Sequence, residues 1–179
     1  RLLDAIDLSL PRGVTGLVGP NGSGKSMFLD LVAGLRRPSR GRVLRNGHVA
    51  YLPQGGACRD GETAEGLLSP GAAPEWRVER ALARVGLRGL DLSRPASSLS
   101  GGEATRLRLA RLLLEEPEAV LLDEPTNHLD EDARRAVHAF VASFPGPVLV
   151  ATHDRGLLAL ADRIAELRNG GLRLHGGSW

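Results

Sequence analysis

Hydrophobic residues recur along the chain with two periods, one typical of β-strands and one typical of α-helices. Short apolar runs predict buried strands at residues 14–18, 119–122 and 147–151, and a looser alternation predicts a half-buried strand at 2–10. Helices are expected at 24–35, 75–85, 100–116, 130–144 and 156–161. Strands that alternate with helices predict an α/β fold with a mostly parallel sheet.

Two Asn-Gly pairs predict tight hairpins. Asn46-Gly47 lies within the strand-like stretch 42–52, and Asn169-Gly170 lies within the stretch 163–175. Asn-Gly between two strand-like runs is the strongest short-range hairpin signal, because both residues tolerate a positive φ. The two hairpins predict a small antiparallel annex to the parallel sheet. Residues 55–74 are rich in Gly, Pro, Ala and Ser and predict a loop with at most one short helix.

Composition narrows the possible function classes. The chain of 179 residues is about one domain long, and its hydrophobic content of 42% is enough for a sizeable core. A formal net charge of +2 and an aromatic content of 3% argue against a dedicated nucleic-acid binder, which needs phosphate neutralisation and stacking platforms. The single cysteine, Cys58, excludes an internal disulfide framework, suits a reducing compartment and is expected to be an inert thiol.

The sequence also predicts where the protein resides. No apolar run approaches the roughly 20 residues that a membrane-spanning helix needs, and no secretory signal pattern opens the chain. We therefore expect a cytoplasmic protein with no direct membrane span, which would need a partner chain to act at a membrane. Because the chain starts at Arg1 without a methionine, we expect a fragment of a longer protein.

Lys25 is the only lysine among 23 basic residues, and it lies in a glycine-rich loop between a predicted strand and a predicted helix. The loop matches G-x-x-x-x-G-K-[ST], in which backbone N–H groups cradle phosphate and the lysine reaches the β- and γ-phosphates. A compact ammonium suits this position better than a planar, forked guanidinium. The alternative, a glycine turn beside an ordinary helix, does not require the full pattern. The predicted nucleotide-binding residues are Gly19, Pro20, Asn21, Gly22, Ser23, Gly24, Lys25, Ser26 and Met27.

Two acidic residues end the apolar strand at 119–122. Parallel sheets bind ligands at the carboxyl ends of their strands, so Asp123 is expected to hold Mg²⁺ together with the Ser26 hydroxyl. Glu124, one residue on, points elsewhere and is the candidate to orient or deprotonate an attacking water. The alternative is a strand end with two solvated acids. The presence of the phosphate loop argues against that alternative.

Two further polar side chains end predicted strands at the same sheet edge. His153 could sense or stabilise a γ-phosphate, with Asp154 fixing its ring. Gln54 could contact Mg²⁺ or the attacking water. A lone histidine or loop glutamine is more often structural or solvated, so both assignments depend on the neighbouring motifs.

A second anion-binding element opens the helix at 100–116. Ser100 is expected to cap the helix, and Glu103 completes a capping box. Ser100, Gly101 and Gly102 then present a hydroxyl and free backbone N–H groups at the positive helix end. This could be just a well-capped helix. Two phosphate-binding elements in one chain, however, suggest that one of them serves a neighbouring molecule.

With these residues in view, the chain resembles an ATP-binding cassette (ABC) ATPase domain. The family's motifs occur in its order: Walker A at 19–26, Q-loop at Gln54, signature at 99–103, Walker B at 120–124, D-loop at 127–130 and switch histidine at His153. The resemblance implies a P-loop NTPase fold of the ABC type, with helices on both faces of the sheet. It also implies a core of about 1–54 and 117–179 and a helical subdomain of about 55–116.

The resemblance assigns roles to these residues. Catalysis by ATP hydrolysis is expected to use Glu124, His153, Lys25 and Gln54, with Mg²⁺ held by Ser26, Gln54 and Asp123. The signature residues Ser100, Gly101, Gly102 and Glu103 are expected to act on ATP bound by a second cassette, in a homodimer or a tandem copy.

Several segments resemble the ABC-F subfamily in particular. They are 121–130, 105–114, 152–155 and 174–179. ABC-F proteins are soluble tandem cassettes that act on ribosomes or other cytoplasmic partners, so contact with nucleic acid is expected only through a ribosome-type partner. This chain has one cassette and no charged helical linker. Residues 1–27 contain no Phe, Tyr or Trp to stack on adenine, and Met27 replaces the usual second hydroxyl residue. Nucleotide preference therefore stays open.

Three alternatives remain beside the ABC-F interpretation. The chain could be the ATPase subunit of a membrane transporter, although the 46 positions from Gln54 to Ser100 make a short insert with Trp76 as its only large aromatic residue. It could also be a non-catalytic regulatory cassette, but every catalytic residue type is present. Direct RNA contact could use Arg36, Arg37, Arg40 and Arg42, although a solvated loop is the favoured interpretation.

Overall fold

The computed structural model describes residues 3–4, 6–55, 61–68 and 73–176; Cys58 and 177–179 lie outside them. Its single sheet has six strands in the order β2-β3-β4-β1-β5-β6. Neighbouring strands are parallel except for the antiparallel pair β5–β6. The strand bounds are β1 Gly13–Val18, β2 Val49–Leu52, β3 Ala119–Asp123, β4 Pro147–Ala151, β5 Arg163–Arg168 and β6 Gly171–Gly176.

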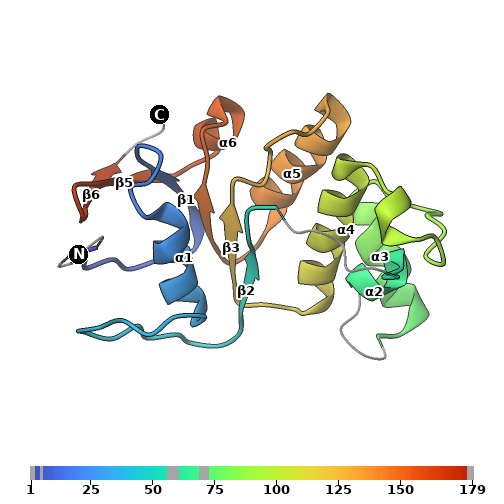
Figure 1. The fold of residues 1–179 in the computed structure, drawn as a ribbon, viewed down its shortest axis with the longest axis horizontal. Helices are drawn as coiled ribbons and strands as arrows, with labels where there is room; N and C mark the ends of the chain where they lie inside the picture. The colour runs from blue at the N-terminus through green and yellow to red at the C-terminus, as the bar shows by residue number, and fades with distance from the viewer. Residues whose placement is uncertain (1–2, 5, 56–60, 69–72, 177–179) are drawn as a thin grey trace.

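The helices cover both faces of this sheet (Figure 1). Helix α1 packs on one face, and α4 and α5 pack on the other. Helices α2 and α3 pack against α4 and lie beyond the end of the sheet next to β2. The bounds are α1 Lys25–Ala33, α2 Ala64–Leu68, α3 Glu75–Arg84, α4 Gly101–Leu114, α5 Glu131–Ser143 and α6 Arg155–Ala159. In the described part of the chain, no helix is both long and apolar enough to cross a bilayer.

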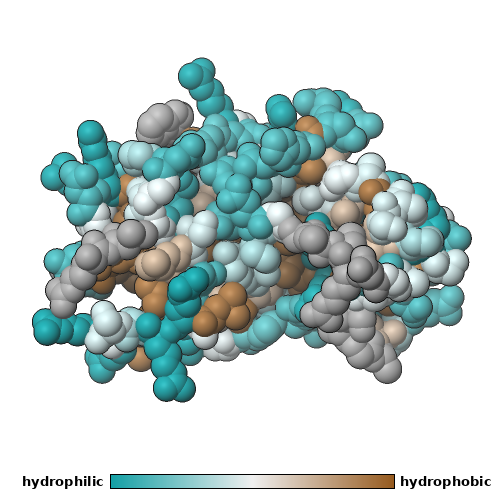
Figure 2. Space-filling model, in the orientation of Figure 1, coloured by the Kyte–Doolittle hydropathy of each residue, from teal (hydrophilic) through white to brown (hydrophobic). Residues whose placement is uncertain are grey.

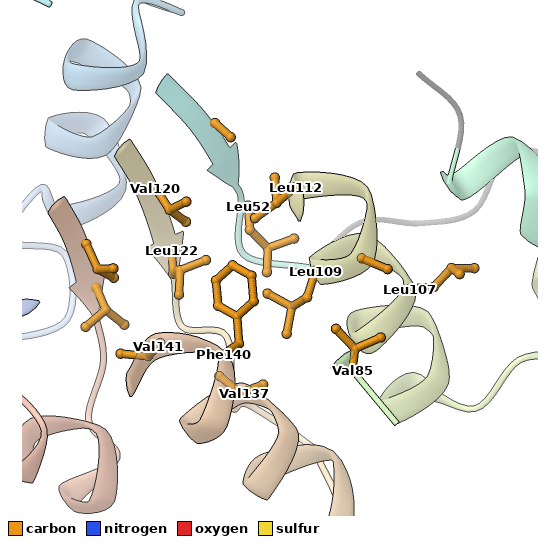
Figure 3. Packing of buried hydrophobic residues seen from close by; sticks show 14 of the residues in the cluster. Leu52, Val85, Leu107, Leu109, Leu112, Val120, Leu122, Val137, Phe140 and Val141 are labelled. Atoms are coloured by element: carbon orange, nitrogen blue, oxygen red, sulfur yellow. The ribbon is translucent and has the colours of Figure 1, made fainter. Parts of the chain in front are cut away.

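The alternation of side chains along β3 divides the core into two layers. Val120 and Leu122 belong to the cluster with α4 and α5, whereas Leu121 belongs to the cluster with α1. Figure 3 shows the Phe140 ring of α5 lying between β3 and α4, near Leu122 and Leu109. Since period-2 alternation fixes the face of every residue on a strand, Asp123 shares the α1 face with Leu121.

The predicted strand at 2–10 does not form. Among the described residues of this stretch, Ile6, Leu8 and Leu10 are half-buried, whereas Asp7 and Ser9 are exposed. The alternation is therefore real, but no described residue of this stretch belongs to a strand ladder, and the Asp4 N–H donates to the Gly170 carbonyl instead. An extended chain without a ladder is not a strand.

The predicted hairpin at 42–52 is also wrong, because long-range contacts replace its ladder. The Arg45 guanidinium donates to the carbonyl oxygens of Leu31 and Val32 at the end of α1, at 2.8 and 2.6 Å. The His48 N–H donates to the Glu118 carboxylate, and β2 pairs in parallel with β3. The hairpin at 163–175 does form, with positive φ at Asn169 and Gly170, and extends the same sheet.

The extended segments 6–12 and 42–46 border a groove of about 1060 Å³. Its apolar lining includes Phe28 and Val32 of α1 and Leu121 of β3. Figure 2 shows hydrophobic surface scattered among polar atoms on the face viewed in Figure 1. The segments thus cover the α1 side of the core only in part.

Candidate functional site

The strand order brings the predicted site residues to one edge of the sheet. The carboxyl ends of β2, β3, β4 and β1 are consecutive neighbours, since these strands are parallel. Gln54 follows β2, Asp123 ends β3 and Glu124 follows it. His153 follows β4, and the glycine-rich loop follows β1. Four motifs spread over more than 130 residues of sequence therefore meet along this edge (Figure 1).

The glycine-rich loop is shaped to leave backbone donors open. Gly22 and Gly24 have φ of 78° and 99°, which L side chains rarely adopt. A Cβ at Gly19 would lie 2.3 Å from the Leu167 carbonyl oxygen, so only glycine fits there. Gly24 caps α1 without a side-chain hydrogen bond, and the Ser23 Oγ is buried with no hydrogen-bond partner among the described residues. These unpaired donors are what a phosphate would accept from.

Lys25 is buried within its own loop, with 8% of its surface exposed. Its Nζ donates to the Gly19 carbonyl at 2.9 Å and to the Pro20 carbonyl at 3.3 Å. A buried charge is costly without partners, and these two neutral dipoles are the ones it has among the described residues. An ammonium carries three hydrogens, so one remains for an anion in the loop.

Glu124 leaves β3 through a strained turn. It has a φ of 46°, uncommon for a residue with a side chain, and its N–H donates to the Ala151 carbonyl at 2.8 Å. Its carboxylate is 8% exposed and lies 3.4 Å from the His153 Nε2. Burial raises the pKa of Glu124, although the His153 ring and the Lys25 ammonium act to lower it. A raised pKa suits a group that orients a water and accepts its proton.

Asp123 is a buried carboxylate at the end of β3. It is 2% exposed, forms no ion pair among the described residues, and accepts one hydrogen bond from the Tyr51 hydroxyl at 3.5 Å. A buried carboxylate without a cationic partner fits a bound metal ion. The Ser26 hydroxyl and the Gln54 amide are exposed and supply further oxygen atoms, the ligand type that Mg²⁺ prefers.

No group of three His, Cys, Asp or Glu side chains that could hold a metal occurs in the described residues. Mg²⁺ usually keeps several waters and takes one or two carboxylates plus substrate phosphates. The predicted set of Ser26, Asp123 and Gln54 is therefore chemically suited to the ion.

The signature residues lie away from Lys25. Ser100 Oγ accepts from the Glu103 N–H at 3.1 Å, and the Glu103 carboxylate accepts from the Ser100 N–H at 2.8 Å, which confirms the capping box. These hydrogen bonds lower the pKa of Glu103. Ser100 and Gly101 are exposed, whereas a Cβ at Gly102 would lie 2.9 Å from Ala133 of α5. Strands β3 and β4 separate α4 from the glycine-rich loop within one chain (Figure 1).

Asp154 makes other contacts than the one predicted for it. Asp154 does not hold the His153 ring; it caps α6 by accepting from the Gly156 and Leu157 N–H groups at 2.7 and 3.2 Å. Its second oxygen lies 3.4 Å from the His138 Nε2, which comes from α5. His153 itself is 57% exposed, with its Nε2 directed to Glu124. The four arginines of the predicted RNA alternative are exposed, and Arg36 pairs with Asp30 at 2.8 Å.

Two features escaped sequence reasoning. Tyr51 of β2 contacts Asp123, and burial, followed by the Asp123 and Asp30 carboxylates, raises its pKa, so the phenol keeps its proton at neutral pH. A cavity of about 300 Å³ also opens beside Gln54, Asp123 and Glu124. Its opposite wall comes from α4 and the loop after β3, namely Thr105, Arg108, Asn127 and His128. The three-residue spacing of Thr105 and Arg108 indicates a shared helix face, but no sequence pattern places that face beside Gln54.

Comparison with known proteins gives consistent results. A family model described as ABC transporter matches residues 3–127. ABC transporter F family member 2 of Arabidopsis thaliana is 33% identical over 189 residues, which cover 99% of this chain and 28% of that protein. The energy-dependent translational throttle protein EttA of Escherichia coli (strain K12) is 35% identical over 175 residues, which cover 92% of this chain and 31% of that protein.

The fold is shared with solved cassettes. A dimeric ATP-binding cassette in a post-hydrolysis state, bound to ADP and Pi, superimposes with a TM-score of 0.86 at 23% identity. The match covers 98% of this chain and 90% of that one. The chain spans less than two-fifths of the length of the curated relatives it matches, between 27% and 38%.

Replacing Glu124 with Gln is expected to raise the free energy of unfolding at neutral pH. Burial raises the folded-state pKa of Glu124 above its unfolded value, so ionisation weakens the folded state as the pH rises through that raised pKa. Glutamine keeps the shape without the charge. The advantage of the variant should vanish at acid pH, where Glu124 is protonated in both states.

Urea unfolding of both proteins between about pH 4 and pH 8 measures this difference. Glu79→Gln, at an exposed position of α3, is the matched control and should follow the parent. Parallel stability curves for the parent and Glu124→Gln would contradict the expected cost of burying this carboxylate.

Proposed function

Because the chain belongs to the ABC transporter family of ATP-binding cassettes, we propose that it binds and hydrolyses ATP at the sheet edge where Lys25, Asp123, Glu124 and His153 meet. The observation that carries the proposal is the pair of buried charges without matching partners. Lys25 bonds only neutral carbonyls among the described residues, and Asp123 only a phenol. MgATP offers an anion to the first and a cation to the second.

The roles follow from the chemistry of each side chain. Lys25 would donate to the β- and γ-phosphates, together with the open N–H groups at the start of α1. Ser26, Asp123 and Gln54 would hold Mg²⁺, which supplies charge neutralisation on the phosphates when bound. Glu124 would orient the attacking water and accept its proton, because burial raises its proton affinity. His153, 3.4 Å from Glu124, would donate to the γ-phosphate.

The site would be completed by a second cassette. Ser100 uses its oxygen to cap α4, which leaves its O–H hydrogen free to donate, and Gly101 beside it is open to approach. Both residues are exposed, and β3 and β4 lie between α4 and the glycine-rich loop (Figure 1). A head-to-tail pair would place the α4 N-terminus of one cassette on the ATP of the other. The dimeric form of the similar solved cassette supports this arrangement.

The output would be a movement of two cassettes. ATP closes the pair by bridging Lys25 of one and Ser100 of the other, and hydrolysis removes the bridging γ-phosphate. We propose a cytoplasmic ABC-F-like ATPase that acts on a ribosome or another cytoplasmic partner, as a homodimer or as one of two tandem cassettes. The similarity to a translational throttle protein supports a partner in translation. The family description as ABC transporter supports the alternative, an ATPase subunit of a membrane transporter.

Glu124→Gln is expected to trap the ATP-bound pair. Without the carboxylate, turnover should fall by about 10²-fold or more, while Lys25 and the Mg²⁺ ligands still bind the nucleotide. Size-exclusion chromatography with light scattering should then find an ATP-dependent dimer, with ATP as the retained nucleotide. Glu79→Gln serves as the control. Turnover of Glu124→Gln at the parent rate would show that Glu124 is not the base.

The two partner classes predict different activators of the ATPase. If the partner belongs to translation, added ribosomes should raise the steady-state rate at saturating MgATP, and the rise should be absent in Glu124→Gln. If the chain serves a transporter, ribosomes should leave the rate unchanged and a permease chain encoded beside it should raise it. No response to ribosomes would contradict the translational proposal.

A further inference from the structure

We propose that Tyr51 is a positioning residue that fixes the Asp123 carboxylate for the divalent cation of the nucleotide. The Arg36–Asp30 ion pair weakens Asp30 as a competitor for the Tyr51 hydroxyl. This inference rests on the proposed function, because it concerns the Mg²⁺ ligand of that site. It adds Tyr51, which lies outside the sequence motifs of the site, and it connects Asp123 through Tyr51 to Asp30 and Arg36 near the end of α1.

The contact between Tyr51 and Asp123 is dictated by strand register. Tyr51 of β2 is paired with Leu121 of β3. Asp123 lies two residues beyond Leu121, so it projects from the same face, toward α1. Diagonal neighbours on one face are within reach of an aromatic side chain. The Tyr51 hydroxyl accordingly points its donor at the Asp123 Oδ2 across 3.5 Å, a contact longer than the usual O–H···O hydrogen bond.

Asp123 depends on this hydrogen bond for its orientation. The carboxylate is 2% exposed and has no ion pair in the described part of the chain, so no other group there fixes it electrostatically. The phenol engages Oδ2 and leaves Oδ1 for a cation. Partners that orient a metal-binding carboxylate in this way typically affect metal affinity.

A second carboxylate competes for the same hydroxyl. Asp30 also acts on the Tyr51 phenol, and it lies four residues after Ser26, hence on the Ser26 face of α1. A phenol has one hydrogen and can donate to one carboxylate at a time. Arg36 Nε donates to the Asp30 Oδ2 at 2.8 Å. The guanidinium therefore weakens Asp30 as an acceptor without excluding the phenol, because a carboxylate has two oxygens and about four lone-pair sites. The two carboxylates share the Tyr51 hydroxyl, and the Arg36–Asp30 pair shifts that sharing toward Asp123.

Tyr51→Phe removes the hydroxyl and keeps the ring in the core. We expect the Mg²⁺ concentration for half-maximal ATP-dependent thermal stabilisation to rise about three- to tenfold. Stabilisation by ATP without metal should match the parent, and ATP hydrolysis at saturating Mg²⁺ should stay within about twofold of the parent rate. A general loss of packing would instead change all three measurements.

Arg36→Gln supplies a second, independent test at an exposed position. Release of Asp30 should divert the phenol hydrogen and raise the same Mg²⁺ midpoint, by less than Tyr51→Phe does. In the Tyr51→Phe background, Arg36→Gln should add nothing, because the hydroxyl through which it acts is gone. Arg37→Gln, the exposed neighbour, is the matched control and should leave the midpoint unchanged.

The outcomes separate this inference from the proposed function. A parental Mg²⁺ midpoint in Tyr51→Phe, or an Arg36→Gln effect that persists without the hydroxyl, would overturn the positioning role while leaving the ATPase intact. A parent chain whose ATP-dependent stabilisation ignores Mg²⁺ would overturn the proposed function, and the inference with it.

Discussion

The site depends on one buried positive charge. Lys25 starts α1 beneath the glycine-rich loop, where its Nζ bonds the Gly19 and Pro20 carbonyls at 2.9 and 3.3 Å. Those carbonyls can point inward only because the loop turns at glycines. A Cβ at Gly19 would strike the Leu167 carbonyl, and Gly24 has a positive φ. The loop is thus shaped around an ammonium whose partners among the described residues are neutral carbonyls.

The parallel sheet places negatively charged side chains at the same edge as Lys25, the edge formed by the carboxyl ends of the strands. Asp123 is the last residue of β3 and faces α1, on the side of the sheet where Ser26 lies. Glu124 turns away through a positive φ and meets His153 from the neighbouring strand end. Consecutive acids therefore have different surroundings, because Asp123 follows the pleat of the strand and Glu124 leaves it through a positive φ. In the proposed function, a nucleotide and a cation would supply the partners that both buried charges lack among the described residues.

Local sequence patterns correctly predicted the features that form within a single short segment. The capping box of Ser100 and Glu103, the strand end at Asp123 and the turn at Asn169-Gly170 are each encoded within a few residues, and each forms as expected. The hairpin at 42–52 fails because Arg45 reaches α1 and Glu118 takes the His48 N–H, contacts that no local pattern contains. Tyr51 was missed for the same reason, since its partner is chosen by the register of β2 on β3.

Binding of ATP to Lys25→Arg, compared with the parent by calorimetric titration, tests the central claim most directly. Arginine keeps the positive charge but cannot place a compact ammonium under the Gly19 and Pro20 carbonyls. If the loop is built around that ammonium for phosphate, the affinity for ATP should fall at least about tenfold, a loss of about 1.4 kcal/mol, in a protein that remains folded by circular dichroism. Parental affinity for ATP in the folded Lys25→Arg protein would contradict the claim.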